Sequence, residues 1–392
     1  MKKIVIAIDS FKGCLTSLEA GKAAAEGVHA ACPGCEVIVV PVADGGEGVL
    51  EVLISATNGR YRTTSAHDPI MELRDARYGI SGDGKTAFIE MAAISGLPLV
   101  PASRRNPMLT TTYGTGELIR DALDYGCRNF IIGLGGSATN DAGLGMLQAL
   151  GFRFFDREGS ELGSPAKGIA ICGALMTEIA SIDSTAVHPA LKETRFTAAC
   201  DVHNPFFGPD GAAFVFSPQK GADRKMATEL DVAMKRLAEV IRLHTGKDVS
   251  DIPGSGAAGG MGGGLLAFLN AELKPGIQLL LDALHFTDKI KGADLIITGE
   301  GKADRQTLMG KVPSGIAAEA GKEKIPVVLL AGSVEDVEEL NQAGFQGVFS
   351  IIPSPTSLEQ AMEPSLAQRN LKRAVEQICR MIQCRQHEAI TG

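Results

Sequence analysis

The chain lacks tryptophan, and only 5% of its residues are aromatic. Surfaces that stack nucleic-acid bases depend on aromatic side chains. The 38 lysines and arginines are scattered along the sequence, and the formal net charge is −8. Because a basic patch is needed to hold phosphate backbones or anionic lipids, we expect neither a nucleic acid nor a membrane as a partner.

Long apolar runs are also missing. No stretch approaches the roughly 18 residues needed to cross a bilayer. The N-terminus, MKKIVIAIDS, has an apolar run that stops at Asp9, which is too short for the core of a secretory signal. We therefore expect a cytoplasmic protein. The sequence does not reveal its oligomeric state.

One cysteine pair, Cys32 and Cys35, has the spacing of a redox or zinc motif. It lies between a predicted helix and a predicted strand, whereas a thioredoxin-type pair follows a strand and opens a helix. No second pair completes a zinc site. We interpret this segment as a turn.

Glycine is abundant, with 47 residues among 392, or about 12% against roughly 7% in average proteins. Many of these glycines follow apolar segments directly. At both ends of the chain such segments alternate with helical patterns: KIVIAID and EVIVVPV near the start, DLIITGE and IPVVLLAG near the end. Continuous apolar strands separated by helices predict a parallel sheet covered on both faces.

The fold class predicted is therefore α/β with two domains. Residues 1–70 and 288–392 are expected to form a discontinuous Rossmann-like domain with a parallel sheet. Residues 71–287 are expected to form an inserted second α/β domain, with the active site in the cleft between the two.

Two segments match nucleotide-binding motifs only formally. Residues 79–86, GISGDGKT, fit the P-loop pattern, but the following TAFIEM has the alternation of a strand, which predicts a hairpin turn. Residues 254–259, GSGAAG, fit G-x-G-x-x-G but follow a proline-containing segment rather than a strand. The glycines of 254–264 nevertheless suit either a phosphate at a helix N-terminus or close helix packing.

Four loops combine glycine with acidic or hydroxyl groups: DSFKG (9–13), ADGGEG (43–48), GLGGSATNDAG (133–143) and TGEGKAD (298–304). Asp9, Asp44 and Glu300 follow predicted strands, at the edge where ligands of open α/β sheets bind. Each alone is more simply a helix cap. Together they would repel one another unless a cation neutralises them, as Mg²⁺ bound to a polyphosphate does. The inserted segment adds Asp201, Asn204 and Lys220.

These loops closely resemble those of the bacterial type I glycerate kinases. The resemblance rests on IAIDSFKG, VPVADGGEG, GISGDGKTAFIEMA, GTGEL, GGSATNDAG, ACDVHNP, PQKGA, GAAGGMGGG and LIITGEGKADRQT. It implies phosphorylation of D-glycerate with ATP and Mg²⁺, and it favours 2-phosphoglycerate as the product.

Within that resemblance we assign roles to the candidate residues. Those expected to act in catalysis are Asp201 as first choice of base, Asp9 as second, and Lys12. Those expected to bind substrate are Asp44, Gly45, Gly46 and Glu47. Those expected to bind nucleotide are Gly135, Gly136, Ser137, Thr139, Asn140, Asp141, Lys220, Gly256, Gly259, Gly260 and Gly262. Those expected to hold the metal are Glu300 and Asp304.

Two other classes remain open from the residues. A nicotinamide-dependent oxidoreductase acting on a small hydroxy acid would use the same glycine loops and would show a change in nicotinamide absorbance. A non-catalytic sensor of a phosphorylated metabolite would bind its ligand without releasing ADP.

Overall fold

The computed structural model describes residues 1–43 and 49–391. Their contacts divide the chain into two units, one made of residues 1–52 and 277–392 and the other of residues 53–276. We call them the terminal unit and the internal unit. Helix α2 (Val49–Ala56) crosses the first division, and α10 (Gly276–Ala283) begins at the second.

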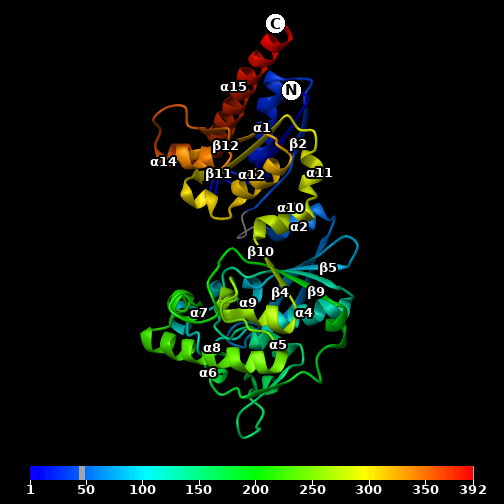
Figure 1. Cartoon of the computed structure of the whole chain (residues 1–392), viewed down its shortest axis with the longest axis vertical. Helices are drawn as coiled ribbons and strands as arrows, with labels where there is room; N and C mark the ends of the chain where they lie inside the picture. The colour runs from blue at the N-terminus through cyan, green and yellow to red at the C-terminus, as the bar shows by residue number, and fades with distance from the viewer. Residues whose placement is uncertain (44–48, 392) are drawn as a thin grey trace. The chain divides into compact units, whose positions relative to one another are not determined.

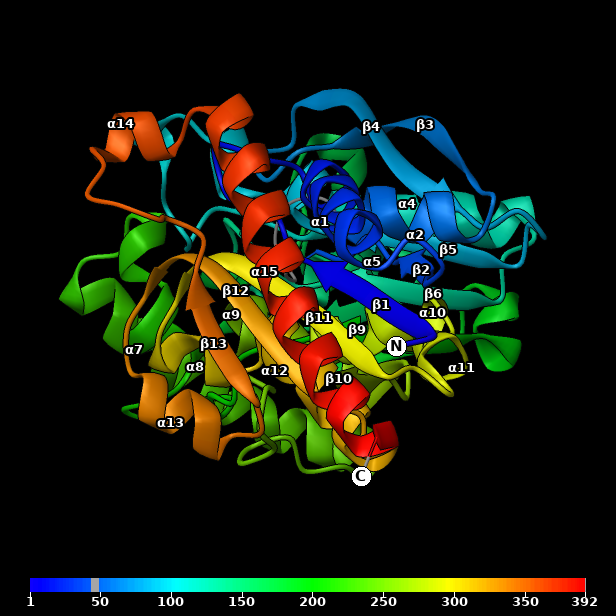
Figure 2. The same ribbon diagram turned by 90° about the horizontal axis from the view of Figure 1, so that it is seen from above.

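The terminal unit is built on a five-stranded sheet in the order β13-β12-β11-β1-β2, with every pair parallel. Strands from both ends of the chain therefore lie side by side, blue beside yellow and orange in Figures 1 and 2. Its elements are β1 (Lys3–Ile8), α1 (Ser17–Ala31), β2 (Glu36–Val39), α11 (Phe286–Ile290), β11 (Leu295–Ala303), α12 (Val312–Lys322), β12 (Val327–Val334), α13 (Val337–Gln342), β13 (Gly347–Ser350), α14 (Leu358–Ala361) and α15 (Pro364–Thr391).

Both faces of this sheet are covered, as the uninterrupted apolar strands predicted. Ile4, Ile6 and Ile8 belong to a buried cluster with residues of α1 and α15, and these two helices lie side by side in Figure 2. They approach so closely that a Cβ at Gly27 would lie 2.3 Å from the Lys372 carbonyl oxygen. Helix α12 contacts β1, β11 and β12. The first and last helices thus close one core.

Helix α1 is capped by Thr16, whose hydroxyl accepts the Glu19 N–H. The Glu19 carboxylate accepts the Thr16 N–H in return, which completes a capping box. Asp9 is therefore not the N-cap residue of α1.

The internal unit contains a six-stranded sheet in the order β10-β9-β6-β5-β4-β3. Strands β5, β6, β9 and β10 are parallel, whereas β3, β4 and β5 form antiparallel pairs. The elements are β3 (Arg60–His67), β4 (Leu73–Ile80), β5 (Thr86–Glu90), α3 (Ala92–Ser95), α4 (Tyr113–Tyr125), β6 (Asn129–Gly133), α5 (Leu144–Ala149), β7 (Arg153–Phe155), α6 (Gly173–Met176), β8 (Ser181–Asp183), β9 (Arg195–Ala199), α7 (Ala212–Phe216), α8 (Arg224–Thr245), α9 (Ala257–Phe268) and β10 (Glu272–Lys274).

The predicted α/β class with parallel sheets is confirmed. The P-loop look-alike is a hairpin turn between the antiparallel strands β4 and β5, as expected. Strand β3 pairs along its whole length with β4. This pairing places residues 60–67 in the internal unit, whereas the sequence pattern had grouped residues 1–70 with the terminal segments. At the other end, α10 contributes to the terminal unit although residues 71–287 were expected to form the insertion.

Candidate active site

The carboxyl edge of the terminal unit's sheet carries Asp9 and Glu300. Ile8 of β1 is paired with Gly299 of β11, and the Asp9 N–H donates to the Gly299 carbonyl at 2.9 Å. A Cβ at Gly301 would lie 3.7 Å from the Lys12 backbone nitrogen. The loop after β1 and the end of β11 are therefore neighbours, as the positions of these acidic residues had predicted.

Glu300 is a buried carboxylate, with only 6% of the residue exposed. Its Oε1 accepts the Thr307 hydroxyl at 2.6 Å, and its Oε2 lies 3.4 Å from Lys311 Nζ. Burial raises the pKa of Glu300, and these two partners oppose the rise. The buried carboxylate thus has a hydroxyl on one oxygen and an ammonium near the other.

Asp304 is tied to Glu300 through Thr307. Asp304 caps the short 3-10 helix Arg305–Leu308 by accepting the Gln306 N–H at 2.8 Å, and its own N–H donates to Thr307 Oγ1 at 3.0 Å. Its other carboxylate oxygen lies 3.3 Å from Lys302 Nζ. One hydroxyl therefore links the two residues predicted to hold the metal.

This arrangement fits Mg²⁺, although no cluster of three His, Cys, Asp or Glu side chains in residues 1–43 and 49–391 could hold a metal ion. Mg²⁺ in phosphoryl-transfer enzymes is bound through one or two carboxylates together with phosphate oxygens and water. A buried Glu300 linked to Asp304 through Thr307 suits such a partial ligand set.

Sequence reasoning missed Thr307 and Lys311 in this part of the site. Thr307 stands three residues after Asp304, and a cap residue followed at that spacing by a side chain that returns a hydrogen bond is a recognisable pattern. Lys311 is the N-cap residue of α12. The sequence offers no indication that its ammonium reaches back to Glu300.

In the internal unit, the loop after β6 carries the main group of predicted nucleotide-binding residues. Gly135 and Gly136 are exposed, whereas Ser137, Thr139 and Asn140 are buried. The exposed part of this loop is therefore the Gly135–Gly136 pair, and the polar side chains that follow are buried.

Asp141 anchors the end of this loop. It is fully buried and accepts four hydrogen bonds: from the Thr112 N–H and hydroxyl at 2.7 and 2.8 Å, and from the Gly143 and Gly145 N–H groups at 3.1 and 3.2 Å. Burial raises the pKa of Asp141 against these donors. Asp141 thus ties the loop to the start of α4, which precedes it in the chain, and to the start of α5, which follows it.

Lys220 lies on the inner side of the same loop. It is 1% exposed, and its Nζ donates to the Ser137 hydroxyl at 2.8 Å and to the Thr139 carbonyl at 2.6 Å. Burial lowers its pKa to about 7, and the Asp141 charge limits the fall. Both acceptors belong to the loop itself, so Lys220 holds the loop together. Its direct contact with phosphate stays a prediction.

The glycine-rich segment at the start of α9 is packed rather than open. Ala258, Gly259 and Gly260 have left-handed φ values, and the Ala142 N–H donates to the Gly259 carbonyl at 3.0 Å. A Cβ at Gly259 would lie 2.1 Å from the Thr139 carbonyl oxygen. Close packing, the alternative left open by the sequence, accounts for the predicted phosphate-binding glycines, all four of which are buried: Gly256, Gly259, Gly260 and Gly262.

Asp201, the first choice of catalytic base, is exposed beyond the end of β9. Its Oδ1 accepts the Gly276 N–H at 2.8 Å, at the first residue of α10. Asp201 belongs to the internal unit, whereas Asp9 belongs to the terminal unit. The predicted substrate-binding residues Asp44, Gly45, Gly46 and Glu47 lie outside the described residues.

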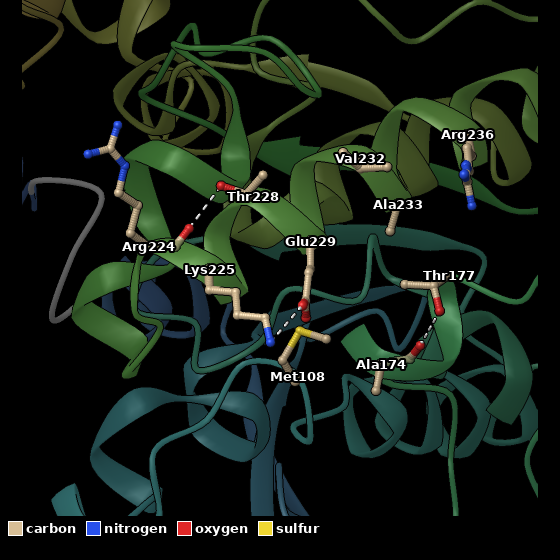
Figure 3. A pocket seen from close by; sticks show the side chains of 10 residues that line it. All are labelled: Met108, Ala174, Thr177, Arg224, Lys225, Thr228, Glu229, Val232, Ala233 and Arg236. Atoms are coloured by element: carbon tan, nitrogen blue, oxygen red, sulfur yellow. Dashed lines mark hydrogen bonds and ion pairs between the residues drawn. The ribbon is translucent and has the colours of Figure 1, made fainter.

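A groove in the internal unit is lined by residues that are not among the predicted site residues. It has a volume of about 790 Å³ and lies between α6 and α8. In Figure 3 Lys225, Glu229 and Met108 lie together on one side of it, whereas Arg224 points away. Lys225 Nζ and Glu229 Oε1 are 3.8 Å apart. Its cations are solvent-exposed or already paired, so it does not resemble a phosphate site.

No helix within residues 1–43 and 49–391 combines the length and the apolar character needed to cross a membrane.

Comparison with known proteins places this chain among relatives along nearly its whole length. Residues 4–383 match the sequence profile described as the glycerate kinase family. The chain belongs to the glycerate kinase family. This confirms the resemblance drawn from its loop motifs, and the chain is thus an enzyme of the kinase class.

Individual relatives agree with that assignment. The protein is 48% identical over 360 residues to glycerate 2-kinase of Escherichia coli K12, covering 92% of this chain and 93% of that one. It is 45% identical over 364 residues to glycerate kinase of Halalkalibacterium halodurans, covering 93% and 94%. A crystal structure assigned as glycerate kinase 2 from Salmonella typhimurium LT2 matches with a TM-score of 0.86 at 43% identity, covering 98% and 99%.

Proposed function

We propose that this protein transfers the terminal phosphoryl group of ATP to the 2-hydroxyl of D-glycerate, with Mg²⁺. The observation that carries the proposal is the match of residues 4–383 to the glycerate kinase family. The choice of the 2-hydroxyl is supported by the 48% identity to an enzyme named glycerate 2-kinase.

The chemistry needs positioning and neutralisation more than covalent assistance, because the phosphoryl group passes through a loose and highly charged transition state. When bound, Mg²⁺ supplies positive charge to the phosphate oxygens. We assign it to Glu300, with Asp304 as the second carboxylate. The buried hydroxyl of Thr307 holds Glu300 in place, and the Lys311 ammonium lies beside its other carboxylate oxygen.

On the nucleotide side, we assign the exposed Gly135–Gly136 backbone to the ATP phosphates. The buried residues Ser137, Thr139 and Asp141 then serve to fix that backbone rather than to contact ligand. A rigid glycine tip suits phosphate, because the chain can approach the oxygens without a side chain in between.

On the acceptor side, we assign the carboxylate and hydroxyls of glycerate to Lys12, Asp44 and Glu47. Asp201 remains the first candidate to accept the proton of the attacking hydroxyl, and Asp9 the second. Asp201 is exposed, and its contact with the Gly276 N–H orients the carboxylate.

The experiment is an assay of ADP release with D-glycerate, with L-glycerate as control, followed by phosphorus NMR of the product. A phosphate on C2 couples to one carbon-bound proton and gives a doublet, whereas one on C3 couples to two and gives a triplet. We expect the doublet, and no turnover after chelation of Mg²⁺. Absence of ADP release, or reduction of a nicotinamide by glycerate, would refute the proposal.

A further inference from the structure

Among the described residues, both hydrogen-bond acceptors found for Lys220 lie in one loop. It ends the short 3-10 helix Pro218–Lys220, which precedes α8, and its side chain is almost fully buried. Both of its hydrogen-bond acceptors, the Ser137 hydroxyl and the Thr139 carbonyl, lie in the loop that follows β6. The amino group of Lys220 therefore holds two residues of that loop together.

The same loop is fixed from other sides at the residue between these two acceptors. The Ala138 N–H donates to the Ser95 carbonyl at 2.9 Å, and the Thr110 hydroxyl donates to the Ala138 carbonyl at 2.8 Å. Lys220 therefore completes a clamp around residues 137–139. The part that the clamp leaves exposed is the pair Gly135 and Gly136.

We propose that Lys220 is a positioning residue for nucleotide: it holds Ser137 and Thr139 so that the Gly135–Gly136 backbone is ready for phosphate, and it takes up a proton when ATP binds. This inference rests on the proposed function, since it takes the loop to be where the ATP phosphates bind.

The electrostatics of the described residues support the second half of the proposal. Burial lowers the pKa of Lys220 to about 7, and the ionisable group that faces it is the buried Asp141 carboxylate. The amine is therefore largely neutral above this pH in the free protein. A polyphosphate at the exposed end of the loop adds negative charge nearby, which favours the ammonium form.

The ammonium form of Lys220 also has one N–H donor more than the acceptors found for it among the described residues. It carries three N–H donors, and two acceptors are found for it among the described residues. Added negative charge at the loop stabilises the third proton without requiring Lys220 to leave Ser137 or Thr139.

Calorimetry of ATP binding measures the proton directly. Titration of Mg-ATP into the full-length protein, in buffers with different ionisation enthalpies, gives the number of protons taken up. With a free pKa of about 7, we expect uptake of close to one proton at about pH 8 and much less at about pH 6. This measurement needs only the wild-type protein.

Two variants assign the proton to a residue. Lys220→Met keeps an unbranched side chain of four heavy atoms but removes the amine, so it should lose the proton uptake and raise the KM for ATP about tenfold. Its KM for D-glycerate should change by less than a factor of about two. Lys247→Met is the matched control: Lys247 is also partly buried with a lowered pKa, but its acceptors are Leu266 and Asn270, away from the loop.

Each outcome decides between the two proposals. Wild-type protein that binds no ATP refutes the proposed function. Wild-type protein that turns over but takes up no proton at about pH 8 refutes the role of Lys220. The role is also refuted if a folded Lys220→Met retains the uptake, or if Lys247→Met loses as much. If Lys220→Met does not fold, the pH dependence of uptake in the wild-type protein still decides.

Discussion

Replacing Gly259 by alanine tests whether the glycine-rich start of α9 really lies against the loop after β6. Gly259 has a φ of +69°, and an added Cβ would lie 2.1 Å from the Thr139 carbonyl oxygen and 2.6 Å from Asn140 Cα. Both neighbours are backbone atoms, so no flexible side chain can move out of the way.

The expected loss of stability has two parts. A left-handed φ costs an alanine about 1–2 kcal/mol. Relief of the contact requires the two backbones to separate by about 1 Å, and overpacking of this kind costs about 1–3 kcal/mol. We therefore expect Gly259→Ala to lower the free energy of unfolding by about 2–5 kcal/mol.

Gly246 provides a matched control. It ends α8 with a φ of +76°, close to that of Gly259, and a Cβ there would meet nothing within 4 Å. Gly246→Ala should therefore show only the conformational part, about 1–2 kcal/mol. The difference between the two variants isolates the contact between α9 and the loop.

Urea unfolding followed by tyrosine fluorescence is the appropriate assay. The chain has no tryptophan, and its four tyrosines, Tyr61, Tyr78, Tyr113 and Tyr125, all lie in the internal unit. The signal therefore reports the unfolding of that unit, and the midpoint at unchanged slope gives the change in stability. Equal midpoints for Gly259→Ala and Gly246→Ala would refute the packing described for this segment.

Three further predictions concern single side chains. Thr307→Val removes the hydroxyl that holds Glu300 and should lower kcat/KM about tenfold in the ADP-release assay, with Thr307→Ser near wild type; an active Thr307→Val would contradict the role of this link. Asp201→Asn keeps an oxygen for the Gly276 N–H, so it should fold normally but turn over about 100-fold more slowly; near-normal turnover would remove Asp201 as the base. Above about pH 7, Lys220 is neutral in the folded protein but still protonated in the unfolded chain. The free energy of unfolding of the internal unit should therefore rise with pH by up to about 1.4 kcal/mol per pH unit until about pH 10. Lys220→Met should show a flatter pH profile by tyrosine fluorescence, and equal slopes would contradict the lowered pKa.

Those parts of the fold that depend on local pattern could be predicted from the sequence. The runs KIVIAI and LIITGE are apolar throughout, and they form the central strands β1 and β11, buried on both faces. The rule that ligands gather at the carboxyl ends of parallel strands correctly placed Asp9 next to the end of β11.

What could not be predicted depends on contacts between distant residues. Strand β3 has no sequence feature that assigns it to either unit, and its pairing with β4 decides the matter. A lysine before a helix, such as Lys220, is ordinarily exposed, and its burial follows from acceptors about 80 residues earlier. Glycines that pack and glycines that bind phosphate have the same sequence signature, and only the neighbouring backbone distinguishes them.

The pairing of β1 with β11 also has a consequence for the order in which the chain folds during synthesis. Residues 53–276 leave the ribosome before β11 has been made. The internal unit can therefore fold before β1 and α1 have the later elements that they pack against. Helix α1 reaches its final packing later than β1, because its partner α15 is the last element to be made. A truncation near the C-terminus should therefore leave the N-terminal segment without a core while sparing the middle of the protein.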